Sequence, residues 1–146
     1  MQEITSKIII QAPRQVVWEV LMDLDNYQSW NTFTPKVETN FEVGTDVILH
    51  VNMKGNGKLL KQKEQILWFK EGKSMAWGIP TRFPVKTERA QILRTVDSET
   101  TEYITYDKFW GVLTPLVMAL YRKKIQQGFD DVAEGLKRHC ELIFKN

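Results

Sequence analysis

The spacing of hydrophobic residues changes several times along the chain, and each change marks a different kind of element. Residues 3–10 alternate weakly and end in an apolar run, which indicates a first strand. Pro13 suits the first turn of a helix, and apolar residues then recur at helical spacing over 17–24. Asp25 can cap a second, short helix over 27–30. The first thirty residues therefore predict one strand followed by two short helices.

From Pro35 onward the pattern is typical of strands separated by short turns. The Asn56-Gly57 pair can adopt the positive φ angles that a tight hairpin requires. Strands joined by such short turns pair antiparallel. The expected strands cover 47–53, 58–69, 74–79, 88–96 and 101–110, with further strand residues before a turn at 41–46.

The last segment returns to helical spacing. Thr114 can cap a helix whose first position is Pro115, and apolar residues recur every three or four positions over 117–143. The pattern predicts one uninterrupted helix of about thirty residues. Gly128 lies inside it, and because glycine weakens a helix we expect a bend or a close backbone contact there.

This order of elements predicts an α+β fold. We expect a strongly curved antiparallel sheet of about seven strands around the long C-terminal helix, with the two short helices after the first strand. A curved sheet cannot close tightly along a whole helix, so the gap between them is a natural pocket. Tyr27, Trp30 and Phe33 are expected at one end of it, either as a lid over the pocket or as a plug of that end.

Composition favours one globular domain over residues 1–146, because 42% of the residues are hydrophobic. The net charge of +2 is too small to indicate a nucleic-acid partner. No apolar run approaches the ~20 residues of a membrane-spanning helix, and residues 1–10 do not form a signal peptide. Cys140 is the only cysteine and is expected in the core. We expect a soluble, cytoplasmic protein.

Three groups of residues resemble the START-like superfamily, and in particular its polyketide cyclase/dehydrase and lipid transport branch, often called SRPBCC. The first group is Ile10, Pro13, Val17, Trp18, Leu21, Asp23, Tyr27, Trp30 and Asn31. The second is the strand over 101–111, which ends in Phe-x-Gly, and the third is Gly128-Phe129 with Gly135-Leu136-Lys137. The resemblance covers nearly the whole chain.

The resemblance implies the helix-grip fold, which agrees with the predicted order of elements, and an internal cavity for a small hydrophobic molecule. Binding or transport of a lipid, isoprenoid or polyketide-like ligand is one interpretation. The alternative is a cyclase/aromatase or dehydratase that works without a metal, and a third is a protein-interaction module with a collapsed cavity. We expect no cofactor, no stable membrane insertion, and a monomer or homodimer.

Polar residues on two neighbouring strands are the candidates for chemistry. If Phe109 points inward, period-two alternation places Asp107, Thr105 and Tyr103 on the same face. Matching the preceding strand to the family pattern turns Arg89 and Gln91 inward as well. A buried aspartate needs a partner, and an arginine is the least costly one, so the sequence predicts an Arg89–Asp107 pair that orients a ligand or stabilises the cavity rim.

The catalytic candidates are Asp107, Arg89 and His50, although a strand histidine is more often solvent-facing than catalytic. No His, Cys, Asp or Glu spacing indicates a metal site. Lysines near the expected hairpin at 54–63 are either a solvated face or a surface for anionic lipids. The residues expected to contact a ligand are Trp30, Phe33, Trp68, Trp77, Phe83, Gln91, Tyr103, Thr105, Phe109, Met118 and Tyr121.

Overall fold

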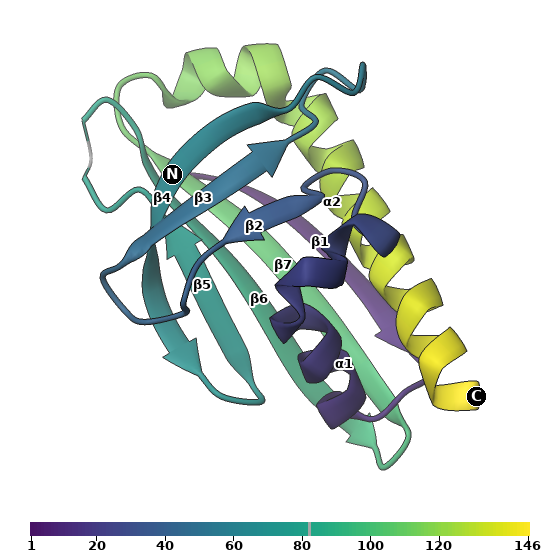
Figure 1. Cartoon of the computed structure of the whole chain (residues 1–146). Helices are drawn as coiled ribbons and strands as arrows, with labels where there is room; N and C mark the ends of the chain where they lie inside the picture. The colour runs from purple at the N-terminus through teal and green to yellow at the C-terminus, as the bar shows by residue number, and fades with distance from the viewer. Residues whose placement is uncertain (82) are drawn as a thin grey trace.

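One antiparallel sheet curves around a long C-terminal helix (Figure 1). The computed structural model describes residues 1–81 and 83–146, and these form seven strands in the spatial order β1-β7-β6-β5-β4-β3-β2. The strands are β1 (Gln2–Ile10), β2 (Lys36–Glu38), β3 (Asp46–Val51), β4 (Leu60–Lys70), β5 (Ser74–Gly78), β6 (Lys86–Asp97) and β7 (Thr100–Trp110). The helices are α1 (Arg14–Met22), the short 3-10 helix η1 (Leu24–Ser29) and α2 (Thr114–Lys145). The predicted architecture is thus confirmed.

Helix α2 lies across the concave face of the sheet and buries one apolar stripe against it. Phe129, Val132, Leu136 and Cys140 on this stripe are all buried. Polar contacts fix the helix to the edge strand β1, where the Ser6 hydroxyl donates a hydrogen bond to Asp130 at 2.8 Å. Cys140 is therefore a core residue, as the sequence predicted, and burial raises the pKa of its thiol to about 12.

The segment after β1 closes one end of the space between sheet and helix. The Tyr27 hydroxyl donates to the Leu21 carbonyl at 2.6 Å, and the Tyr27 and Trp30 rings meet edge to face at 4.9 Å. The Trp30 carbonyl rests on Gly135 of α2, where an added Cβ would lie 2.0 Å from its oxygen. Trp30 is thus buried against α2 at this end of the molecule, in the position expected for a plug.

Strand ends differ from the predicted ones by one or two residues, and three other local features differ more. The second short helix spans Leu24–Ser29 rather than 27–30, so Asp25 lies in its first turn instead of capping it. Helix α2 begins at Thr114, and Leu113 occupies the cap position expected for Thr114. The β3–β4 connection runs from 52 to 59 in place of a tight turn at Asn56-Gly57.

Two features of the loop explain why the β3–β4 connection is wide: the residues that have positive φ angles and the hydrogen bonds of its asparagine side chains. Gly55 and Gly57 have positive φ angles, and Asn56 does not. The Asn52 amide oxygen accepts from the Gly57 N–H at 3.2 Å, and that of Asn56 accepts from the Lys58 N–H at 3.0 Å. Such side-chain bonds stabilise a broad loop over a two-residue turn.

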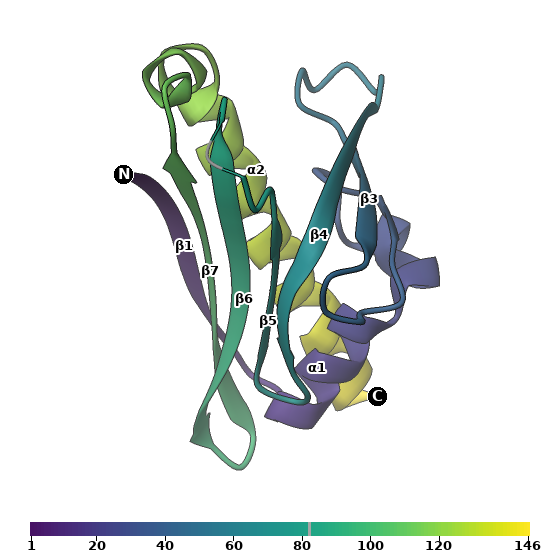
Figure 2. The same ribbon diagram turned by 90° about the vertical axis from the view of Figure 1, so that its left-hand side faces the viewer.

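Loops and the first turns of α2 form the far end of the molecule (Figure 2). Figure 2 shows the β3–β4 loop and the first turns of α2 splayed apart at this end, with the β5–β6 loop between them. At the other end α1 packs against α2, β6 and β7. Within the described residues, no helix combines the length and apolar character needed to cross a bilayer.

Candidate functional site

A cavity of about 320 Å³ lies between the concave face of the sheet and α2. Its wall is mostly aliphatic and aromatic, with contributions from strands β3 to β7, helix α2 and the loop that follows η1. The volume falls within the range of about 300–1,000 Å³ found for small-molecule sites. The apolar part of the wall includes Leu49, Val51, Val85, Val117, Ile125 and Phe129.

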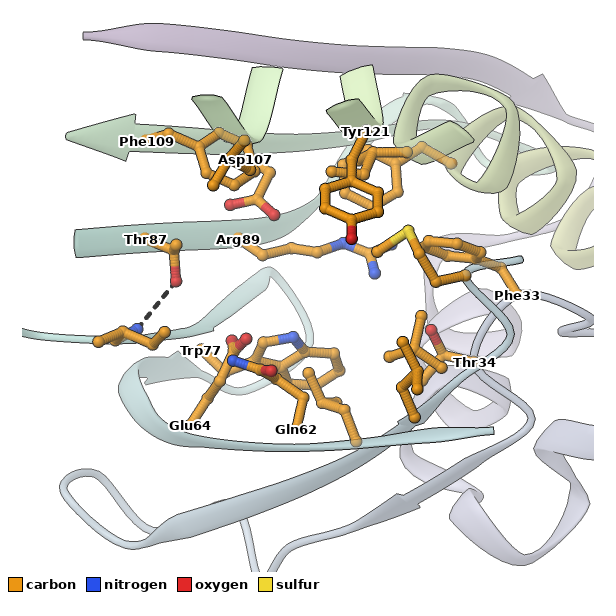
Figure 3. Close-up of a pocket in the computed structure, with 18 of the residues that line it drawn as sticks. Phe33, Thr34, Gln62, Glu64, Trp77, Thr87, Arg89, Asp107, Phe109 and Tyr121 are labelled. Carbon is orange, nitrogen blue, oxygen red and sulfur yellow. Dashed lines mark hydrogen bonds between the residues drawn. The ribbon is translucent and has the colours of Figure 1, made fainter. Parts of the chain in front are cut away.

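Three ionisable side chains enter this apolar space from three strands. Arg89 comes from β6, Asp107 from β7 and Glu64 from β4 on the opposite side of the cavity (Figure 3). Their positions follow from register, because Arg89 pairs with Asp107 across β6 and β7 and also with Trp77 of β5. Residues paired directly across strands point to the same face of a sheet, so this polar group projects from the concave face.

Arg89 is a buried residue, at 7% exposure, and two contacts hold its guanidinium. Its Nε donates to the Thr105 hydroxyl at 3.2 Å, and the guanidinium stacks over the Phe129 ring at 4.1 Å. Among residues 1–81 and 83–146, no acceptor lies at hydrogen-bonding distance and angle from its two terminal nitrogens, although the guanidinium is near the Tyr103 hydroxyl and opposes the effect of burial on the pKa of that group. The side chain is therefore oriented by the protein while four N–H donors are left for another molecule.

The predicted Arg89–Asp107 ion pair is not formed. The two residues are direct cross-strand neighbours, but the guanidinium turns toward Thr105 and Phe129. Asp107 Oδ1 is buried and has no hydrogen-bond partner among the described residues. Burial, and next the nearby Glu64 carboxyl, raise the pKa of Asp107 well above its usual value, while Arg89 acts in the opposite direction.

The pKa of the Glu64 carboxyl is also raised. Burial raises the pKa of its carboxyl to about 7, although the positive charge of Arg89 opposes the change. Both carboxyls are thus biased toward the protonated form, in which each donates one hydrogen bond. The N–H of Trp77 adds another donor to the cavity wall, since it is buried and has no partner among the described residues.

Four of the eleven residues predicted to contact a ligand line the cavity: Phe33, Trp77, Phe109 and Tyr121. Three others face inward but lie behind this wall. The Tyr103 hydroxyl donates to Gln91 at 2.7 Å, and Thr105 donates to the Ala90 carbonyl at 2.9 Å while it accepts from Arg89. These residues support the arginine rather than line the cavity.

The remaining predicted positions lie elsewhere. Trp30 plugs the closed end, Phe83 is 79% exposed, and Met118 lies outside the cavity wall beside Arg122. Trp68 is on the outer face, where its N–H donates to Ser74 at 3.2 Å.

The misplacement of Trp68 has a definite cause. Ile66 pairs with Trp77, but Trp68 pairs with Ala76, so β4 carries one extra residue relative to β5. This β-bulge reverses the alternation of faces along the strand.

His50, the third catalytic candidate, is not at the cavity. It alternates with the inward residues Leu49 and Val51 of β3, so it points to the outer face, where its Nε2 lies 2.8 Å from a Glu38 carboxylate oxygen. The structure brings together the other two candidates, Arg89 and Asp107, and adds Glu64.

Glu64 is the main residue that sequence reasoning missed. It lies in the charged stretch 61–65, which is typical of a solvated strand. The available signal was the alternation Gln62, Glu64, Ile66, whose last member is an apolar core residue. The sequence places Phe129 on the apolar stripe of the long helix. It does not show that Phe129 contacts Arg89, because that contact depends on how the helix crosses the sheet.

The family profile for polyketide cyclase/dehydrase and lipid transport matches residues 1–141. The chain belongs to this family. The match agrees with the cavity enclosed by a curved sheet and a long helix. No curated protein shows a significant sequence match to the chain.

Solved structures share the fold across nearly the full chain. The ZhuI aromatase/cyclase from Streptomyces sp. R1128 superposes with a TM-score of 0.75 at 18% identity, covering 96% of this chain and 93% of that one. A START superfamily protein from Mycobacterium smegmatis gives 0.73 at 13% identity, with 97% and 98% covered. A protein from Thermus thermophilus, TTHA0849, gives 0.73 at 16% identity, with 97% and 99% covered. Similarity at this level of identity establishes the helix-grip fold.

Proposed function

We propose that the protein binds a small, largely apolar molecule that carries an acceptor oxygen, such as a carbonyl or carboxylate, at one end. The apolar body occupies the cavity, and the oxygen accepts hydrogen bonds from Arg89. The observation that carries the proposal is Arg89, a buried residue that lines the cavity and whose Nε donates to Thr105, while its terminal nitrogens make no such bond within residues 1–81 and 83–146.

A buried charge without full hydrogen bonding is costly, and Phe129 and Thr105 compensate for only part of that cost. A ligand oxygen would complete the set of hydrogen bonds. Two side chains that favour the protonated form, Glu64 and Asp107, and the N–H of Trp77 supply further donors around the same point. An oxygen-bearing group therefore suits this part of the cavity better than a cation does.

The direct test is native mass spectrometry of the purified protein, followed by solvent extraction and identification of any bound molecule. A quantitative version uses two fluorescent probes: the polyene carboxylate cis-parinaric acid and the neutral N-phenyl-1-naphthylamine. Arg89→Met is compared with Arg94→Met, a matched control on the same strand whose side chain is exposed and paired with Glu102. A charge-assisted hydrogen bond is worth about 1.5–3 kcal/mol, so Arg89→Met should weaken parinaric acid binding by roughly 10- to 150-fold.

The neutral probe should bind both arginine variants with similar affinity, because it makes no charge-assisted bond. Failure of the native protein to bind either probe would contradict the proposed function. Equal effects of Arg89→Met and Arg94→Met on the carboxylate probe would refute the role given to Arg89.

Acid–base catalysis on a bound ketone is a second candidate function, favoured by the two carboxyls on either side of Arg89 (Figure 3). In a dehydration, ionised Glu64 would take a proton from the carbon next to the carbonyl. Protonated Asp107 would give its proton to the departing hydroxyl, which leaves as water. A carboxyl whose pKa is about 7 is suited to this exchange near neutral pH.

The catalytic candidate predicts turnover, which can be tested once the extraction has identified the class of molecule that binds. Incubation of the protein with a β-hydroxy ketone of that class should yield a product lighter by one water. Glu64→Gln and Asp107→Asn should abolish the product while parinaric acid still binds. Binding without turnover would leave only the carrier interpretation.

A further inference from the structure

Three parts of the chain lie at the end of the molecule opposite the plug: 53–60 between β3 and β4, 79–81 with 83–85 between β5 and β6, and 112–121 at the start of α2 (Figures 1 and 2). Each contributes residues to the cavity wall. The last two are joined directly, because the Leu113 N–H donates to the Pro84 carbonyl at 3.3 Å. We call these segments the rim.

Large apolar side chains protrude from the rim. Phe83 and Val112 are 79% and 70% exposed. Leu113, Leu116 and Leu120 are also exposed, and their spacing places them along one side of α2, whereas Val117 and Tyr121 of the same turns face the cavity. Exposed apolar side chains gathered in this way mark an interaction site.

The charged residues within and next to these segments of the sequence are all basic. The stretches 53–61, 79–86 and 110–124 contain no aspartate or glutamate, although the chain has 18 of them. Glu64 and Asp107 line the cavity wall, and Asp131 shares a surface hollow with Lys54, Lys123 and Lys124, so acids flank the three stretches without lying in them. The lysines in the three stretches are Lys54, Lys58, Lys61, Lys86, Lys123 and Lys124.

We propose that the rim docks on the surface of a membrane that contains anionic lipids. The apolar side chains enter the headgroup region, and the lysines contact lipid phosphates. This inference rests on the proposed function, because docking would let an apolar molecule pass between the bilayer and the cavity without crossing water. Leu59 and Leu60, at 44% and 49% exposure, add apolar surface from the third segment. Exposed apolar residues on three segments, with lysines beside them, match a lipid surface, on which each basic residue contributes about 1 kcal/mol.

The test is flotation of the full chain with vesicles of phosphatidylcholine alone and of phosphatidylcholine with phosphatidylglycerol in a 7:3 ratio. We expect binding to the anionic vesicles that falls sharply between 50 and 500 mM salt. The double variant Leu116→Glu, Leu120→Glu should lower the partition coefficient at least tenfold. Leu142→Glu, at a 62% exposed position at the far end of the same helix, should leave it unchanged.

The lysines are tested in the same way. Lys58→Gln should reduce vesicle binding about fivefold, and Lys73→Gln in the exposed β4–β5 turn at the other end of the sheet should not reduce it. Equal binding to both vesicle types, or binding that salt does not change, would overturn the charge argument and with it the proposal.

Binding of N-phenyl-1-naphthylamine in the same samples separates this proposal from the proposed function. Rim variants that lose vesicle binding and keep the probe would support docking. A native protein that binds the probe and ignores both vesicle types would refute docking and leave the proposed function standing. The rim could instead bind a second copy of the chain, and size-exclusion chromatography with light scattering measures the molar mass that decides this. A homodimer that Leu116→Glu dissociates would assign the rim to a second copy and refute membrane docking.

Discussion

Replacement of Glu64 by glutamine tests the electrostatics of the cavity through the stability of the fold. The side chains have the same shape, so the substitution removes an ionisable group and leaves packing nearly unchanged. Burial raises the pKa of the Glu64 carboxyl from 4.5 to about 7. At ~1.4 kcal/mol per pKa unit, ionisation of this group costs the folded state about 3 kcal/mol.

The sign of the pH dependence follows from where each state holds the proton. Below pH 4.5 both the folded and the unfolded chain are protonated at Glu64, and the group has no effect. Between pH 4.5 and about 7 the unfolded chain releases the proton and the folded chain keeps it, so stability falls as pH rises. Above that range the full destabilisation is present.

Glu64→Gln should therefore raise the free energy of unfolding by about 3 kcal/mol at pH 8 and by only about 1 kcal/mol at pH 5. Urea unfolding followed by tryptophan fluorescence measures both values in the same buffers. Glu134→Gln, at an exposed position of α2, serves as control and should change stability by less than about 0.5 kcal/mol at either pH. An equal effect of Glu64→Gln at the two pH values, or a loss of stability at pH 8, would refute this account of the cavity.

Three further substitutions test contacts of the fold around the site. Gly135→Ala places a methyl group 2.0 Å from the Trp30 carbonyl oxygen, a backbone atom, and should cost about 3 kcal/mol in urea unfolding; a cost under 1 kcal/mol would contradict the close packing of helix and plug. Gly128→Ala would place a methyl group 2.4 Å from the Phe33 ring, so the ring should move into the cavity. The affinity for N-phenyl-1-naphthylamine should then fall about tenfold, or 1.4 kcal/mol. Unchanged affinity would show that Phe33 can move without narrowing the cavity. His50→Gln should change the free energy of unfolding by less than about 1 kcal/mol, because the partner of His50 is the exposed Glu38. The affinity for the probe should not change. A tenfold loss of affinity would show that His50 acts at the site.

Much of the fold was predictable because the spacing of apolar residues within each helix or strand indicates which of its faces is buried. The strand pattern, the short helices and the 32-residue α2 follow from apolar spacing, and the curved sheet around one helix follows from their order. The close approach expected at Gly128 is also present, with the Phe33 ring as the neighbour. The role of Gly135 was not foreseen, because nothing in the sequence indicates that the Trp30 carbonyl rests there.

The candidate site was predictable only where alternation remains regular. Arg89 and Asp107 lie on strands with an unbroken period of two along this stretch, and both line the cavity as predicted. Trp68 was misplaced because a bulge in β4 reverses the faces, and bulges carry no reliable sequence signal. The predicted Arg89–Asp107 pair failed because Thr105 and Phe129 hold the guanidinium instead, through contacts between elements far apart in the chain.

Local spacing was enough to predict which elements form and which strand faces are apolar, and the motifs of the sequence carried the resemblance to a known family. Three properties of the site required the folded arrangement. They are the meeting of Glu64, Arg89 and Asp107 in one cavity, the effect of burial on the pKa values of the two acids, and the gathering of exposed apolar side chains and lysines at one end of the cavity. These properties depend on distances between strands and helix, which are set when the sheet curves around α2.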